Sequence, residues 1–155
     1  MSEKFEVSFN SPQCGWMSVG FKNGENEFHS TTAYTPYKGV LSEILQTLTS
    51  LITENSVEKL IKWNRLPEEF DFIFKRNNES ATIEIYQYPT DERLEKELVF
   101  THTGEPNQIA ESFHETFAQL YEARETDEFE ANWKQPFPFA DFEKFESALK
   151  TQTNI

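Results

Sequence analysis

The hydrophobic residues of this chain change their spacing three times, and this change is the feature that most restricts its fold. From residue 5 to residue 34, apolar and polar residues alternate with a period of two, as in half-buried strands. Residues 40–52 instead place apolar side chains at three- and four-residue steps, which is the period of an amphipathic helix. Alternation returns between residues 57 and 102, and helical spacing returns from residue 106. Strands grouped apart from helices are typical of an α+β protein, not of a parallel βαβ sheet.

Turn signals divide the alternating segments into strands. Asn23-Gly24 is a strong hairpin signal, and Asn77-Asn78 marks a second turn. Residues 57–63 fit either a short helix or a strand, and we favour a strand because Ile61 and Trp63 alternate with Lys62. We therefore predict an antiparallel sheet of about six to seven strands.

Two main helices are expected to pack on this sheet, over residues 37–53 and 106–124. Thr35 is the expected cap of the first helix and Pro36 suits its first position. A short C-terminal helix would pack back through Phe142, Phe145 and Leu149. Residues 1–155 then form a single domain. The expected core residues are Phe5, Val7, Val19, Phe21, Leu41, Ile44, Leu45, Leu48, Phe72, Phe74, Ile83, Ile85, Phe113, Phe117 and Leu120.

The composition excludes several classes of function. There are 27 acidic and 14 basic residues among 155, so the formal net charge is −13, and direct binding to a nucleic acid backbone is disfavoured. A single cysteine, Cys14, excludes an internal disulfide and a cysteine-based zinc site. The 15 Phe, 5 Tyr and 3 Trp supply a core that disordered acidic chains lack. Without an apolar leader or membrane-length apolar run, a cytoplasmic protein that does not bind membranes is expected.

No catalytic motif is recognisable. The five glycines stand singly, and neither a nucleophile elbow nor a paired-histidine zinc helix is present. The prediction is a protein that is not an enzyme and has no cofactor or metal. Two alternatives remain open: a metal-assisted hydrolase using His29, His102 or His114 with a carboxylate, and a small-molecule-binding module with an apolar cavity lined by the aromatic residues.

The acidic residues are concentrated in one part of the chain. Residues 91–130 carry 12 acids and 3 bases, which accounts for −9 of the net charge of −13. Such a segment is either a solvated face or a docking surface for a basic protein partner. Trp133, in Trp133-x-x-Pro136-Phe137-Pro138, is either a plug for the core or an exposed anchor. The predicted partner-binding residues are Glu111, Glu115, Glu122, Asp127, Glu128, Glu130 and Trp133.

The order of these motifs resembles an uncharacterised family of small, acidic bacterial α+β proteins. The likeness is carried by Thr35-Pro36 before a Leu-rich helix, by Pro67-Glu68 at a strand start, and by residues 133–138 before the last helix. The resemblance implies no catalytic residues. In size, acidity and layout the chain is also loosely similar to immunity proteins that neutralise bacterial toxins. We therefore expect a binding protein of this kind, and the sequence does not determine its oligomeric state.

Overall fold

The computed structural model describes residues 4–24 and 26–153 and contains two antiparallel sheets. The first sheet is a meander of β1 (Phe5–Phe9), β2 (Trp16–Asn23) and β3 (Asn26–Ala33). The second sheet is a meander of β4 (Ser56–Asn64), β5 (Glu69–Asn77), β6 (Ser80–Tyr88) and β7 (Glu97–Gly104). The α+β class and the antiparallel pairing are thus confirmed, as is the strand interpretation of residues 57–63.

The prediction of one continuous sheet is wrong. The strands divide into sheets of three and four, and within the described residues no ladder of hydrogen bonds joins them. Their apolar faces meet instead: the ring centroid of Phe21 lies 5.7 Å from that of Phe72 and 5.9 Å from that of Phe100. Phe28 of β3 lies 5.4 Å from Phe70 of β5 in the same way. Packing face to face buries both rows of aromatic rings. In a single flat sheet, only the helices could cover these rings.

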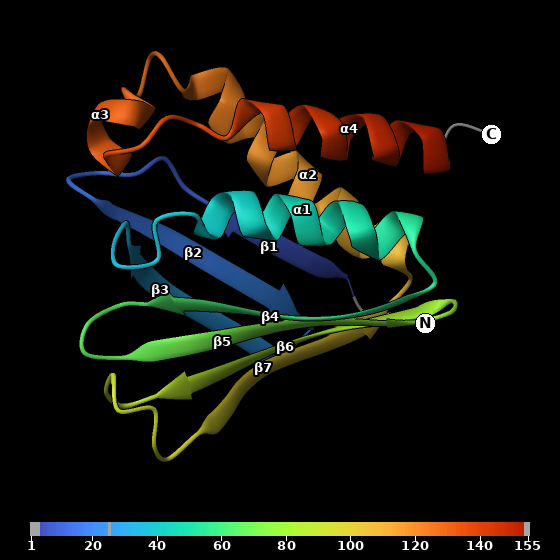
Figure 1. The fold of residues 1–155 in the computed structure, drawn as a ribbon, viewed down its shortest axis with the longest axis horizontal. Helices are drawn as coiled ribbons and strands as arrows, with labels where there is room; N and C mark the ends of the chain where they lie inside the picture. The colour runs from blue at the N-terminus through green and yellow to red at the C-terminus, as the bar shows by residue number, and fades with distance from the viewer. Residues whose placement is uncertain (1–3, 25, 154–155) are drawn as a thin grey trace.

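The helices gather on one side of the strands, as Figure 1 shows. They are α1 (Val40–Thr53), α2 (Pro106–Ala123), the five-residue α3 (Phe129–Trp133) and α4 (Phe139–Thr153). α1 packs on β4 and β5, α2 packs on β1, and α4 packs on both of these helices. Phe142 and Phe145 of α4 are buried, as expected for the C-terminal helix.

The start of α1 corrects one prediction. Thr35 does not cap the helix and Pro36 is not its first residue, because Gly39 occupies the cap position and the helix begins at Val40. The hydroxyl of Tyr37 donates a hydrogen bond of 2.5 Å to Glu69 on β5. This contact holds the chain before α1 against the second sheet. Thr35, Pro36 and Tyr37 thus belong to the connection between β3 and α1.

The core agrees closely with the sequence prediction. Every residue expected in it is buried except Val7, which is partly buried against it. Phe113 of α2 is central, since its ring lies about equally far from those of Phe5, Phe9 and Phe21 in the first sheet, at 6.0–6.1 Å, and 5.8 Å from Phe74 in the second. One helical residue therefore joins both sheets.

Candidate functional site

Six of the predicted partner-binding residues lie on α2 and around the connection from α2 to α3. Glu111, Glu115 and Glu122 are spaced by four and seven residues, so they share one face of α2, and all three are exposed. Asp127 and Glu128 are exposed in the connection, and Glu130 is exposed in α3. We call these six residues the acidic surface.

No basic side chain of the described residues neutralises the acidic surface by an ion pair. The three bases of residues 91–130 are engaged elsewhere. Arg93 pairs with two carboxylates of β5, the Lys96 Nζ lies 4.1 Å from the ring centroid of Tyr86, and Arg124 lies over the ring of Tyr121. The negative charge of the acidic surface is therefore exposed to solvent and to any partner.

The structure divides the acidic segment of residues 91–130. Asp91, Glu92 and Glu95 belong to the connection between β6 and β7. Figure 1 shows this connection, in yellow, at the bottom of the view and α3 at the top, with the strands and α1 between them. The segment is therefore not one patch, and the candidate surface is limited to its second half.

The connection from α2 to α3, together with α3, is held in place by hydrogen bonds to the loop between β1 and β2. The Ser11 hydroxyl donates to the Asp127 carboxylate at 2.7 Å, and the backbone N–H of Cys14 donates to the side-chain oxygen of Asn132 at 3.1 Å. The Asn132 amide in turn donates to the carbonyl oxygens of Asp127 and Glu128 at 3.2 and 3.1 Å. These contacts preorganise the acidic connection, which lowers the entropy lost when a partner binds.

Trp133 does not lie on this surface. Its side chain is 1% exposed and meets Trp63 of β4 edge-on at a centroid distance of 6.4 Å. The interpretation as a plug of the core is the one that the structure confirms, and the exposed anchor is wrong. The reason is its place at the end of a helix of five residues, whose apolar side chains Phe129 and Trp133 both turn inward.

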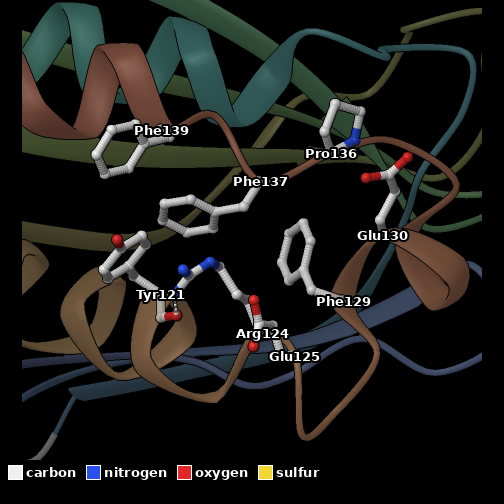
Figure 2. Close-up of a pocket in the computed structure, with 8 residues that line it drawn as sticks. All are labelled: Tyr121, Arg124, Glu125, Phe129, Glu130, Pro136, Phe137 and Phe139. Atoms are coloured by element: carbon white, nitrogen blue, oxygen red, sulfur yellow. Dashed lines mark hydrogen bonds between the residues drawn. The ribbon is translucent and has the colours of Figure 1, made fainter.

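A groove of about 450 Å³ opens beside the acidic surface, between the end of α2, α3 and the segment before α4. Figure 2 shows its residues, and we call it the α2–α3 groove. Glu130 is the one member of the acidic surface among them. The apolar walls of the groove are Tyr121, Phe129, Pro136, Phe137 and Phe139, and its charged groups are Arg124, Glu125 and Glu130.

Sequence reasoning missed most of this groove. Of its residues, only Glu130 is among the predicted partner-binding residues, and Pro136 and Phe137 enter only through the motif that contains Trp133. The signal was the pair of aromatic clusters on either side of an acidic stretch, at residues 117–121 and 133–139. Their convergence depends on α3, which the sequence pattern did not predict.

The sequence also did not reveal a buried cluster of charges. On β5, Glu69 and Asp71 are each 4% exposed, and Arg93 reaches both, with nitrogen–oxygen distances of 2.9 and 2.5 Å. The hydroxyls of Tyr37 and Tyr88 donate to Glu69 and Asp71 at 2.5 and 2.7 Å. Every charge in the cluster thus has an internal partner, which is the condition for burying it at tolerable cost.

The cluster raises the pKa values of three of its members. The hydrogen bond to Asp71 and burial raise the pKa of Tyr88, while burial and the hydrogen bond to Glu69 raise that of Tyr37. Burial alone lowers the pKa of Arg93, but hydrogen bonds with Tyr37 and Asp71 outweigh it, so the net pKa is raised. The arrangement ties the β6–β7 connection to β5.

The three histidines lie in different surroundings. His29 contacts Glu27 at 3.2 Å, His114 contacts Glu146 at 2.9 Å, and His102 stacks on Phe5 at 4.5 Å. Within residues 4–24 and 26–153, no group of three or more His, Cys, Asp or Glu side chains is placed to share a metal ion. The alternative of a histidine metal site gains no geometric support.

Among the described helices, none has the length and apolar character needed to cross a membrane. Comparison of the chain with protein-family models, with curated proteins and with solved structures finds no match in any of the three.

Proposed function

We propose that this chain is a non-enzymatic, cytosolic binding protein that docks a basic protein through the acidic surface, in the manner of toxin-neutralising immunity proteins. One observation carries the proposal. Six exposed carboxylates on α2, the α2–α3 connection and α3 have no ion-pair partner among the described residues. Long-range attraction by such a surface steers a basic partner toward it and increases the rate of association.

A rigid acidic surface suits a partner that acts on nucleic acid. A protein that binds phosphates presents a basic cleft, and carboxylates held in a fixed arrangement compete for that cleft. The hydrogen bonds from Ser11 and Asn132 hold the acidic connection before the partner arrives. Neutralisation of a basic, nuclease-like toxin is therefore the specific form of binding that we propose.

The test is association kinetics with the basic protein captured from the source cell. Reversal of Glu115, Glu122 and Glu128 to Lys should slow association about tenfold or more at low salt, and should flatten the fall of the rate with added salt. Asp127 is left intact because it accepts the hydrogen bond from Ser11. The matched control reverses Glu58, Glu79 and Glu143, which are also exposed but lie outside the acidic surface.

An acidic captured partner would defeat the proposal. Equal slowing by the test and control variants would defeat it as well, because net charge and not this surface would then control association. A co-expression assay adds a functional readout: growth should be protected from the captured toxin by the native chain and by the control, but less by the test variant.

A small-molecule-binding module is the second candidate, and the α2–α3 groove favours it. Its volume of about 450 Å³ falls within the range of roughly 300–1,000 Å³ that is usual for ligand sites. The groove lies at the surface beside α3, however, and not between the strands where the aromatic residues were expected to line a cavity. Binding of a neutral metabolite in the groove, with no basic protein partner, would favour this second function.

A further inference from the structure

The walls of the α2–α3 groove are aromatic faces suited to a planar cation. Tyr121 and Phe139 stack at a centroid distance of 5.3 Å with their planes 25° apart, and Phe137 lies 5.6 Å from Tyr121. Phe139 is 46% exposed, so part of its ring is open to solvent. An exposed aromatic face attracts a cation through its quadrupole.

The groove already holds one guanidinium group. The Arg124 guanidinium carbon lies 3.9 Å from the ring centroid of Tyr121, and its Nη1 donates to the Tyr121 carbonyl oxygen at 2.6 Å. Figure 2 shows this side chain between the aromatic wall and Glu125. The groove thus already accommodates a guanidinium group against one of its aromatic faces.

Two carboxylates of the groove remain available as acceptors. Glu125 and Glu130 are exposed, and within the described residues neither forms an ion pair, even with Arg124 beside them. With one guanidinium and two carboxylates, the groove has a formal charge of −1 and is complementary to one further cation. Arginine fits this site better than lysine, because its planar group stacks on rings and pairs with a carboxylate through two hydrogen bonds.

We propose that the α2–α3 groove receives an arginine side chain of the basic partner, which stacks beside Phe139 and pairs with Glu125 or Glu130. The inference rests on the proposed function, since it names the side chain that the partner would insert next to the acidic surface. It makes the groove a specificity site, whereas the acidic surface controls the rate of association.

The test uses short peptides as probes, so it does not depend on the partner. Acetyl-Gly-Arg-Gly-amide is titrated into the full protein chain, which is labelled with nitrogen-15. Two further peptides, in which citrulline or lysine replaces the arginine, are titrated in the same way. We expect the arginine peptide to shift the amide signals of the groove and to bind more tightly than the lysine peptide. Citrulline keeps the planar shape but lacks the charge, so its peptide should bind most weakly.

Variants then assign the binding to the groove. Phe139→Ala should weaken binding of the arginine peptide about two- to fivefold, the range of an exposed cation–π contact. Glu125→Gln with Glu130→Gln should weaken it as well, while Arg124→Gln should strengthen it by removing a like charge. Controls are Leu94→Ala, which is exposed elsewhere, and Glu58→Gln with Glu79→Gln.

Equal binding of the citrulline peptide, shifts confined to other surfaces, or no response to Phe139→Ala would overturn the inference. These results are separable from those for the proposed function. Should the lysine reversals on the acidic surface slow the partner while the groove variants change nothing, docking stands and the arginine site fails. Should the arginine peptide bind the groove while the captured partner is acidic, the reverse holds.

Discussion

At the scale of single residues, the charges of this protein follow two opposite rules. Glu69 and Asp71 are buried and paired with Arg93 and two tyrosine hydroxyls. The carboxylates of the acidic surface are instead exposed and form no ion pair with the described residues. A buried charge without a partner is costly, while an exposed one is solvated by water. The buried cluster therefore serves the fold, and the exposed carboxylates remain available for binding.

The buried cluster predicts a loss of stability at alkaline pH. Because the pKa values of Tyr37 and Tyr88 are raised above the usual value of about 10, the folded state favours the protonated phenols. The contribution of these two tyrosines to the stability of the folded state is complete below pH 10. It is lost as the pH rises through the raised pKa values, since the unfolded state then releases protons more readily. Urea unfolding midpoints measured from pH 8 to pH 11 should therefore fall.

The double variant Tyr37→Phe with Tyr88→Phe should start less stable and lose less between those pH values. Tyr86→Phe is the control, because its hydroxyl makes no hydrogen bond with the described residues. An alkaline loss that is the same in the double variant and the native chain would mean that other groups cause it.

At the scale of elements, α2 connects every layer of the molecule. Its buried face packs on β1 through Phe113 and Thr116, whose hydroxyl accepts a hydrogen bond of 2.7 Å from the Phe9 N–H. Its exposed face carries three carboxylates of the acidic surface, and its last turn supplies Tyr121 to the groove. The packing of one helix thus fixes the position of the candidate site relative to both sheets.

Phe113→Ala should lower the free energy of unfolding by about 3–5 kcal/mol, the usual cost of removing a buried phenylalanine ring. The ring contacts aromatic residues of both sheets, so the cavity left behind lies where they meet. Gln119→Ala, on the exposed side of the same helix, should change stability by no more than about 0.5 kcal/mol. Urea denaturation measures both, and a loss below about 1 kcal/mol for Phe113→Ala would contradict this packing.

At the scale of the whole molecule, the net charge of −13 acts against the compact state. Like charges repel one another over distances of about 8–10 Å at moderate salt, and more strongly when salt is removed. The core must offset this repulsion, and it does so with a continuous cluster of buried aromatic and aliphatic side chains from both sheets and all four helices.

Added salt should therefore raise the thermal midpoint of the native chain. The variant with Glu115, Glu122 and Glu128 changed to Lys should have a higher midpoint than the native chain at low salt, because each reversal raises the net charge by two. The difference should shrink at high salt, where the repulsion is screened. A lower midpoint for the variant at low salt would show that these carboxylates make stabilising contacts, and calorimetry at two salt concentrations decides between the outcomes.

Local pattern determined much of this protein. Period-two alternation, the Asn23-Gly24 turn and the three- and four-residue steps of α1 and α2 predicted the strands, the main helices and the core, because each reflects which face of one element is buried. The exposed positions of Glu111, Glu115 and Glu122, the members of the acidic surface on α2, followed from the same helical spacing. Their role in binding stays a prediction. Only tertiary structure decided that seven strands form two sheets, because alternation identifies a buried face but not what covers it.

Contacts between distant residues decided the rest. Arg93 meets Glu69 and Asp71 across more than 20 residues of chain, and the ring of Trp133 packs against that of Trp63, which is 70 residues earlier in the sequence. The α2–α3 groove exists because residues 121–125, 129–130 and 136–139 converge around a helix of five residues. A helix that short has too few residues to show a period, so only the packing of its neighbours could place it.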